Sequence, residues 1–202
     1  MPKSIDADPD SLVKVCQLTE QETAKLEQEL HTTDSQVRSA TFERLHQLLK
    51  DRALFRLPPS SISEALQHAD VETRRQASWA IGKMAQNKLP GDYSLGIMEQ
   101  LTLDPDGEVR ENAAWAIGEI SGVQLGREGS IAFLNHLLAD ESFEIRGMAA
   151  WSIGRLAEKL FLGNVSSLGP LLKMAEDKSE LVRKSAKFAL DRLAKIGIIA
   201  SV

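Results

Sequence analysis

Apolar and polar positions repeat along this chain with a period of 36 residues. Residues 109–118 have close copies that begin 36 positions earlier, at Thr73, and 36 positions later, at Ile145. Within each copy, residues three and four positions apart share one apolar side, which is the period of an amphipathic α-helix. A repeat of this length predicts an array of stacked helical units.

Each period also contains a first helix before this stretch. Leu26 and Leu30 form its apolar stripe, and the same spacing recurs in the later periods. Thr19 and Glu22 have the spacing of a capping box, so the first helix is predicted to begin there. Residue types that cap helix N-termini precede the second helices: Asp34, Asp70, Asp106, Ser142 and Ser179. The pattern therefore predicts an all-α fold of about five antiparallel helix pairs, in units near residues 19–54, 55–90, 91–126, 127–162 and 163–202.

The first and last units differ from the three units between them. Glu43 and Phe188 stand where the middle units have tryptophan, and such divergence is expected of terminal repeats, which have one face without a neighbouring unit. Residues 1–18 are predicted to form a leader or short cap outside the repeat domain of residues 19–202. The apolar tail that begins at Ile196 and ends at Val202 is expected either to fold back over the core or to provide an edge for a partner or a second copy.

Composition narrows the class of protein. The chain is 43% hydrophobic and 26% charged, as in ordinary soluble domains, and it lacks an apolar run of the roughly 20 residues that span a bilayer. A single cysteine, Cys16, excludes an internal disulfide, and a secretory signal is not recognisable, so we expect a cytoplasmic protein. The net charge of -5 disfavours general nucleic-acid binding.

The second-helix motif carries a family resemblance. It has an acidic or hydroxyl cap, three variable positions, an arginine, and then a small-small-Trp-small-Ile-Gly run. It resembles the short HEAT-like repeats named after phycobilin lyases, over residues 19–197 and most specifically at residues 73–84, 109–120 and 145–156. The resemblance implies an armadillo/HEAT-like α-solenoid, curved and right-handed, with the second helices lining the concave side. It also implies a binding scaffold, although a minority of members assist in attaching or removing chromophores or bind nucleic acid.

One arginine occupies the same place in every second helix: Arg38, Arg74, Arg110, Arg146 and Arg183. A guanidinium suits bidentate bonds to carboxylates, so we interpret the five residues as a structural ladder that ties each unit to Asp or carbonyl groups of the adjacent one. The alternative is a row of anion or phosphate contacts, which requires exposed and unpaired arginines.

Aromatic side chains stand at one repeated position, at the edge of the predicted concave face: Trp79, Trp115, Trp151 and Phe188. In one interpretation each indole packs over Gly82, Gly118 or Gly154 of a neighbouring second helix. In the other, the rings form an exposed strip for a partner, because Trp is enriched in binding hot spots. Both can hold together.

The helical wheel places Glu111, Gly118 and Ala114 on the same predicted concave side as Trp115. Binding specificity is expected at positions of this side that differ between units, namely Arg75, Glu111, Gly147 and Lys184, with Lys83, Glu119, Arg155 and Arg192 beside them.

Signatures of catalysis or metal binding are not recognisable in the sequence. The four histidines lack helical i,i+4 spacing, and neither a phosphate loop nor a Gly-x-Ser-x-Gly elbow occurs. We therefore predict a non-enzymatic scaffold, without cofactor or metal, that binds another protein on its concave face. Two alternatives stay open: an accessory or lyase-type factor acting on a bilin-carrying protein, which only the resemblance suggests, and nucleic-acid binding through the arginine ladder.

Overall fold

The computed structural model describes residues 18–52, 59–89 and 91–199, so most of the predicted leader, Cys16 and the last three residues of the tail lie outside the described residues. The secondary structure of the described ranges is helical and contains no strand. Its α-helices form five consecutive pairs: α1 (Glu20–Leu30) with α2 (Ser35–Lys50), α3 (Pro59–Leu66) with α4 (Val71–Gln86), α5 (Leu95–Leu101) with α6 (Gly107–Ile120), α7 (Gly129–Leu137) with α8 (Phe143–Leu160), and α9 (Leu168–Met174) with α10 (Glu180–Lys195). Short 3₁₀ helices, η2 (Ser121–Val123) and η3 (Val165–Ser167), follow α6 and precede α9. The prediction of an α-solenoid of five helix pairs is confirmed.

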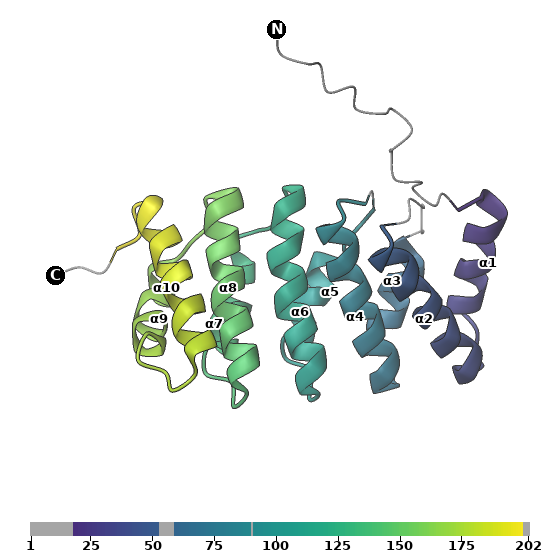
Figure 1. The fold of residues 1–202 in the computed structure, drawn as a ribbon, viewed down its shortest axis with the longest axis horizontal. Coiled ribbons are helices and arrows are strands. Elements are labelled where there is room, and N and C mark those ends of the chain that lie inside the picture. The colour runs from purple at the N-terminus through teal and green to yellow at the C-terminus, as the bar shows by residue number, and fades with distance from the viewer. Residues whose placement is uncertain (1–17, 53–58, 90, 200–202) are drawn as a thin grey trace, which may run out of the picture.

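The pairs follow one another along the long axis of the molecule in sequence order (Figure 1). The second helices α2, α4, α6, α8 and α10 form the layer nearest the viewer in Figure 1. The first helices α3, α5, α7 and α9 lie behind them, and α1 stands at the end of the row beside α2. Consecutive second helices contact each other directly, as α4 does with α6 and α8 with α10. The inner second helices α4, α6 and α8 therefore have neighbours on three sides and one open side. We call the surface formed by the open sides of the second helices the second-helix face.

Local capping sets the start of most helices. Thr19 and Glu22 form both hydrogen bonds of the predicted capping box at the start of α1. The predicted caps of the second helices are all at N-cap positions, and four of them accept a hydrogen bond from a first-turn amide, namely Asp34, Asp70, Asp106 and Ser142. Ser179 is the N-cap of α10 without such a bond. These starts are therefore determined by residues close in sequence.

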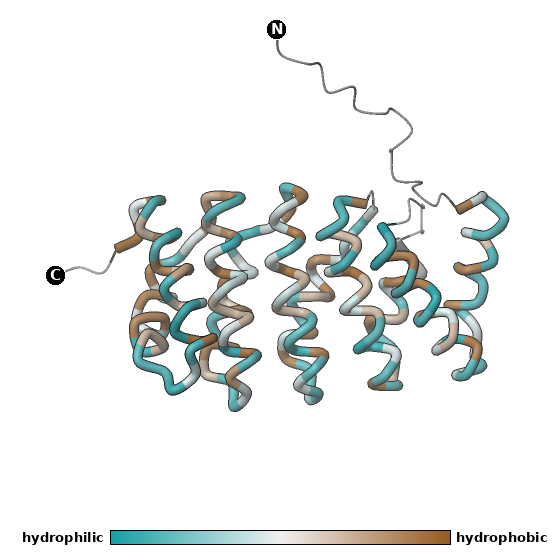
Figure 2. The backbone as a smooth tube through the Cα atoms, in the orientation of Figure 1, coloured by the Kyte–Doolittle hydropathy of each residue, from teal (hydrophilic) through white to brown (hydrophobic). Residues whose placement is uncertain are grey.

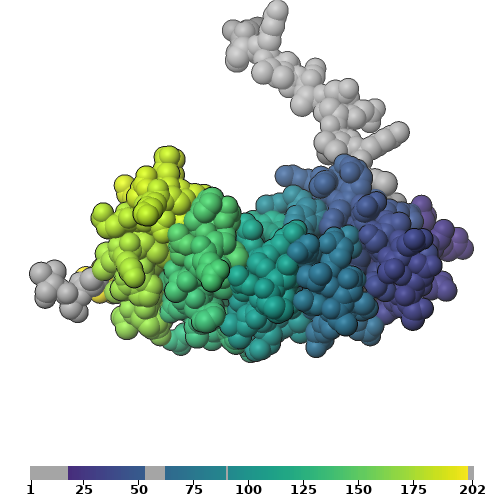
Figure 3. Space-filling model, turned by 90° about the horizontal axis from the view of Figure 1, so that it is seen from below, coloured from purple at the N-terminus to yellow at the C-terminus, as the bar shows by residue number. Residues whose placement is uncertain are grey.

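The hydrophobic core runs between the two layers through all five pairs. Hydrophobic positions recur along every helix instead of gathering in one part of the chain (Figure 2). Ile81, Ile117 and Ile153 occupy equivalent places 36 residues apart, and all three are fully buried. In the space-filling view of Figure 3 the units lie side by side in sequence order. Among the helices of the described ranges, none combines the length and apolar character that crossing a bilayer requires.

The residues that follow α10 pack back onto the core of the last unit. Ile196 and Ile198 pack against the core, and the N–H of Ile198 donates to the carbonyl oxygen of Leu193 at 3.0 Å. A Cβ on Gly163 would lie 2.6 Å from Ile198, so this part of the tail lies tightly against the preceding loop. Residues 196–198 thus fold back onto the core, whereas Ile199 is 65% exposed.

The outer edge of α10 is charged where the corresponding edge of α8 is small and buried. In α8 this edge consists of Gly147, Ala150 and Gly154, which pack against α10. The equivalent positions of α10, 37 residues later, are Lys184, Lys187 and Asp191, and all are exposed. A further helix cannot pack there as closely as α10 packs on α8.

Candidate functional site

The arginine ladder joins successive units at the N-terminal ends of the second helices. Arg74 donates from Nη1 to the carbonyl oxygens of His68 and Ala69 in the turn of its own unit, both at 2.9 Å. Its Nε and Nη2 donate to the two oxygens of Asp104 in the next unit, at 2.8 and 3.1 Å. The same arrangement recurs for Arg110 with Asp140. Arg146 also donates to two carbonyl oxygens of its own turn, but its Nε and Nη2 both donate to the same oxygen, Oδ2, of Asp177.

The aspartates of the ladder also close the turns in which they lie. Asp104 Oδ1 accepts from the backbone N–H of Asp106, two residues later, at 2.9 Å. Asp177 accepts in the same way from Ser179 at 2.8 Å, and this amide together with the Arg146 guanidinium lowers the pKa of Asp177. Three of the five ladder arginines are therefore held in ion pairs and do not offer free guanidinium groups to phosphates.

The two ends of the ladder differ from its middle. Arg38 donates from Nε to Thr73 Oγ1 at 3.1 Å and from Nη1 to the carbonyl oxygen of Thr32 at 2.8 Å. Arg183 donates to two carbonyl oxygens of its own turn, those of Asp177 and Lys178, and its side chain is exposed. Within the described part of the chain, neither arginine forms an ion pair with a carboxylate.

The aromatic residues pack onto glycines of the preceding second helix. A Cβ placed on Gly118 would lie 2.5 Å from the ring of Trp151. The rings of Trp115 and Phe188 stand in the same relation to Gly82 and Gly154, also at 2.5 Å. All of these rings remain half-buried. The aromatic strip is therefore both a packing element between units and a part of the second-helix face.

Trp79 differs because its neighbour on α2 is His46 and not a glycine. The two ring centroids are 4.2 Å apart, and the centroid of Trp115 lies 6.4 Å from that of Trp79 on the other side. His46 Nε2 donates to the carbonyl oxygen of Gln76 at 3.1 Å, and burial lowers the pKa of His46. The indole of Trp79 therefore packs against the imidazole of His46, whereas the later aromatic rings pack against a glycine.

A hollow of about 290 Å³ lies beside Trp79 on the second-helix face. Helices α2, α4 and α6 line it with side chains that include His46, Arg75 and Asn112. Arg75 donates to both carboxylate oxygens of Asp106, at 2.9 and 2.6 Å, and this contact lowers the pKa of Asp106 to about 2. The floor and walls of the hollow are therefore fixed by contacts between units.

The prediction that Ala114 and Gly118 line an open surface is wrong. Both are buried, and the carbonyl oxygen of Ala114 accepts from Ser152 Oγ of the next second helix at 2.7 Å. Gly147, expected at a specificity position, is also buried, with its Cα facing Leu181. These positions face a neighbouring second helix, which a wheel drawn for one helix does not include.

Glu111 and Lys184 do lie at accessible positions. Glu111 is half-buried, and its pKa is raised by burial and by the negative charges of Glu144 and Glu108. Lys184 is exposed and pairs with Glu180 one helical turn away at 2.8 Å. The structure therefore brings Arg75, Glu111 and the aromatic residues onto the second-helix face, whereas Lys184 lies at the charged end of the array.

A second polar network, which the sequence pattern alone did not connect, joins the C-terminal ends of the second helices. Arg155 lies 3.8 Å from Glu119 of the preceding helix and 3.2 Å from Glu158, and Arg192 lies 3.1 Å from Glu158. The guanidinium of Arg155 also lies over the ring of Trp151, 5.5 Å from its centroid. The sequence signal for this network is the change from Glu119 to Arg155 at equivalent repeat positions. Equivalent positions of successive units lie side by side in a solenoid, so opposite charges there can form an ion pair.

Serine residues form a third link, in the layer of first helices. Ser130 Oγ donates to Glu99 in the preceding unit at 2.7 Å, and Ser167 Oγ donates to Asn135 at 2.7 Å. Glu99 is almost fully buried, and the exposed Arg127 pairs with its carboxylate. The recurrence of serine at this place is the sequence signal that could have indicated the link.

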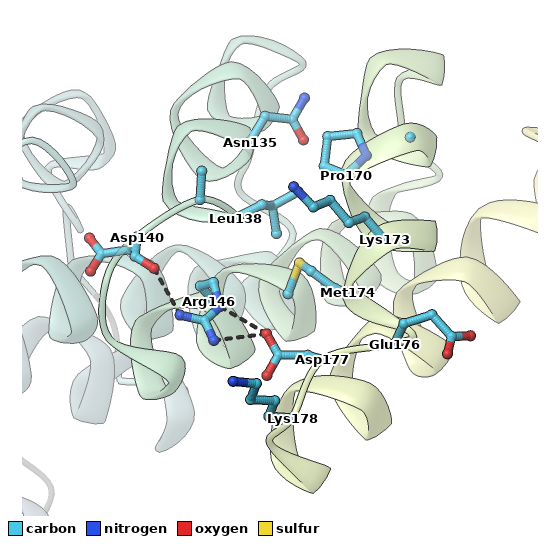
Figure 4. A pocket seen from close by; sticks show the side chains of 12 residues that line it. Asn135, Leu138, Asp140, Arg146, Pro170, Lys173, Met174, Glu176, Asp177 and Lys178 are labelled. Carbon is cyan, nitrogen blue, oxygen red and sulfur yellow. Dashed lines mark hydrogen bonds and ion pairs between the residues drawn. The ribbon is translucent and has the colours of Figure 1, made fainter.

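A pocket of about 840 Å³ lies at the turns of the last two units (Figure 4). Asn135 and Leu138 of one unit face Pro170 and Lys173 of the next across it. Arg146 lies at its edge, bonded to Asp177 and to the carbonyl oxygen of Asp140, so its charge is already compensated. Groups of His, Cys, Asp and Glu side chains that could hold a metal ion do not occur among the described residues.

The stacked helix pairs, with one polar ladder at each end of the second helices, define an α-solenoid repeat protein. A family model described as HEAT repeats matches residues 94–191. No curated protein sequence matches the chain significantly. The fold of the chain is an armadillo/HEAT-like α-solenoid.

Several solved structures are similar to this chain over most of its length. One is a designed armadillo repeat protein in complex with the peptide (KR)4, with a TM-score of 0.65, 25% identity, and coverage of 88% of both chains. A second designed armadillo repeat protein has a TM-score of 0.63 and 25% identity, over 86% of this chain and 83% of its own. A third structure, of armadillo repeat proteins designed computationally for modular peptide recognition, has a TM-score of 0.65 and 25% identity, over 86% of this chain and 82% of its own.

Proposed function

We propose that this protein is a non-enzymatic scaffold that binds an extended segment of another protein along its second-helix face. The observation that carries the proposal is the hollow beside Trp79, where an indole, an imidazole and the amide of Asn112 meet on a rigid surface. Its shape is fixed before binding, since Arg75 is held by Asp106 and Asn112 donates to the carbonyl oxygen of Arg75 at 3.2 Å. A preorganised site loses less entropy when it binds.

The aromatic strip extends the contact beyond the hollow. Trp79, Trp115, Trp151 and Phe188 stand on four successive second helices, and each ring is half-buried. Because glycine contacts or His46 hold one side of each ring, the remaining surface is presented in a fixed orientation. Such rigid aromatic surface is a frequent source of binding energy in protein interfaces.

The similar structures support a peptide as the type of ligand. Their titles describe a complex with the peptide (KR)4 and designs for modular peptide recognition. In this chain, Glu108, Glu111 and Glu144 lie close enough for their charges to interact. A segment that carries Lys or Arg would be complementary to this part of the face.

Peptide selection tests the proposal and does not require the partner to be identified first. A displayed library of random peptides is selected on the full-length protein, and the binders are measured against Trp79→Ala and Glu111→Arg. We expect each face variant to weaken binding at least tenfold. Gln100→Arg is the matched control, because it introduces an arginine into the layer of first helices, and circular dichroism checks that all variants are folded.

Binders that keep full affinity for both face variants would contradict the proposal, as would binders that are lost only with Gln100→Arg. The resemblance to phycobilin-lyase repeats would add an accessory role on a bilin-carrying protein, and an absorbance change on mixing with bilin and its apoprotein tests that role separately. Nucleic-acid binding by the ladder predicts strongly salt-dependent retention on DNA or RNA, although three of its arginines are ion-paired.

A further inference from the structure

A pocket between the first two units contains a buried arginine that has no carboxylate partner among the described residues. Arg38 is only 7% exposed and lines this pocket, whose volume is about 290 Å³. Its Nε and Nη1 donate to uncharged oxygens, and Nη2 has no hydrogen bond to any residue that the structure describes. A buried charge is costly unless an opposite charge lies beside it.

The three later junctions show what occupies this place elsewhere. There the ladder arginine meets Asp104, Asp140 or Asp177 of the following unit. At the first junction the equivalent residue is His68, 36 positions before Asp104. The first junction therefore has the ladder arginine but a histidine in place of the aspartate.

His68 replaces only one of the two contacts made by an aspartate. Its Nδ1 accepts from the N–H of Asp70 at 3.0 Å, just as Asp104 Oδ1 accepts from Asp106 at 2.9 Å. Because Nδ1 is an acceptor, the proton of the neutral ring is on Nε2. In the later units the aspartate presents an acceptor oxygen to the arginine. At this junction His68 presents an N–H donor instead, so the pocket contains two donors, from Arg38 and from His68.

The other polar groups around the pocket do not compensate the charge of Arg38 directly. Thr73 Oγ1 accepts from Arg38 Nε and donates to Asp70 at 2.6 Å, so a hydroxyl separates this carboxylate from the guanidinium. Glu64 also lines the pocket, but it pairs with His31 at 2.8 Å.

We infer that this pocket binds a small oxyanion, a carboxylate or a phosphate, which supplies the acceptor oxygen that Asp104 supplies to Arg74. Arg38 Nη2 and His68 Nε2 are the donors, and Thr33 lines the same pocket. The site is separate from the second-helix face, because its lining shares no residue with the hollow beside Trp79. It therefore stands independently of the proposed peptide binding.

Anion titration of the full-length protein tests the inference. Sodium phosphate and sodium acetate are added in separate experiments at constant ionic strength, with chloride as the balancing anion, while the His68 ring protons are followed by NMR. We expect a saturable shift of the His68 signals and a rise of several degrees in the melting temperature. A response to phosphate alone identifies a phosphate group as the ligand, and an equal response to acetate identifies a carboxylate.

Two variants distinguish this site from general anion effects. Arg38→Gln should weaken the anion response at least tenfold. Arg183→Gln is the matched control, because Arg183 also has no carboxylate partner in the part of the chain that the structure describes, but is exposed at the end of the array. It should leave the response unchanged.

A third variant keeps the test decisive if Arg38→Gln does not fold. His68→Asp with Thr73→Val reproduces the residues of the next junction, Asp104 and Val109. We expect this double variant to melt at a higher temperature than wild type in chloride and to gain nothing from phosphate or acetate. Wild-type His68 signals that do not move with either anion would overturn the inference, as would a double variant that still responds.

Discussion

Substitution of Gly118 by alanine tests the packing between second helices most directly. The new Cβ would lie 2.5 Å from Cζ3 of Trp151 and 2.7 Å from Ser152 Oγ, whereas carbon atoms in contact are normally about 3.5–4.0 Å apart. An overlap of about 1 Å requires the indole to move or α6 to separate from α8. Overpacking of this kind costs about 1–3 kcal/mol.

The helix propensity of alanine opposes this cost. Alanine is favoured over glycine inside a helix by about 1 kcal/mol, so the net destabilisation by Gly118→Ala should be about 0–2 kcal/mol. Gly147→Ala in α8 isolates the propensity term, because its Cβ would meet the nearest atom, Cγ of Leu181, at the ordinary distance of 3.4 Å. We expect Gly147→Ala to stabilise the protein by about 1 kcal/mol.

Urea unfolding followed by circular dichroism measures both variants. Their difference in the free energy of unfolding should be about 1–3 kcal/mol, which is the overpacking cost alone. In a Trp151→Ala background, Gly118→Ala should destabilise the protein less than in wild type, because only the contact with Ser152 Oγ remains. If Gly118→Ala stabilises wild type as much as Gly147→Ala does, the reasoning about indole and glycine packing is refuted.

Three further predictions concern the charged groups. Arg110→Met should destabilise the protein by about 3 kcal/mol in urea unfolding, because it leaves the nearly buried Asp140 without its cation; a loss below about 0.5 kcal/mol, typical of a surface pair, would contradict this. Glu111→Gln should stabilise the protein by about 0.5 kcal/mol at pH 7. The fold raises the pKa of Glu111, so its charged form is penalised at neutral pH. The gain from Glu111→Gln should vanish at pH values below the unfolded pKa, where Glu111 is protonated in both the folded and the unfolded state. A gain in stability that persists at such pH values would contradict this cause. Lys187→Ala with Asp191→Gly should promote self-association in analytical ultracentrifugation, because it restores the small edge that receives a helix in α8, and a variant that stays at the wild-type mass would show that other features close the array.

Helix starts and the repeat could be predicted because their signals are local. Thr19 with Glu22, and Asp34, Asp70 and Asp106, satisfy amides within three residues, so their effect does not depend on the rest of the fold. The period of 36 residues then fixes the pairing of helices. Tertiary context was not needed for either result.

Surface exposure could not be predicted as well, because it depends on neighbours far away in sequence. Ala114 and Gly118 lie opposite the side of α6 that meets α5, yet they are buried by α8. A wheel drawn for one helix pair distinguishes the core side from the other sides but not an open side from one that meets the next unit. The sequence predicted Asp or carbonyl partners for the ladder arginines but not which aspartate each would contact. Asp104 is recognisable as the partner of Arg74 only when the position of the next unit is known.

Both candidate sites arise where the first junction departs from the repeat. His46 stands where α4 has Gly82, and it lines the hollow beside Trp79. His68 stands where the following unit has Asp104, so Arg38 has no carboxylate partner among the residues that the structure describes. At the later junctions an aromatic ring packs against the glycine, and the aspartate forms an ion pair with the arginine. The groups that could bind a ligand are therefore already in contact with the neighbouring unit.

Restoring the repeat at this junction should therefore remove both sites together. His46→Gly with His68→Asp should lose affinity for the selected peptides as the ring of Trp79 closes onto α2, and should no longer respond to phosphate or acetate, while its helical content stays near that of wild type. The single substitutions provide the control: His46→Gly should affect only peptide binding, and His68→Asp only the anion response. Loss of both activities in either single variant would show that the two sites are coupled and that the departures from the repeat do not act separately.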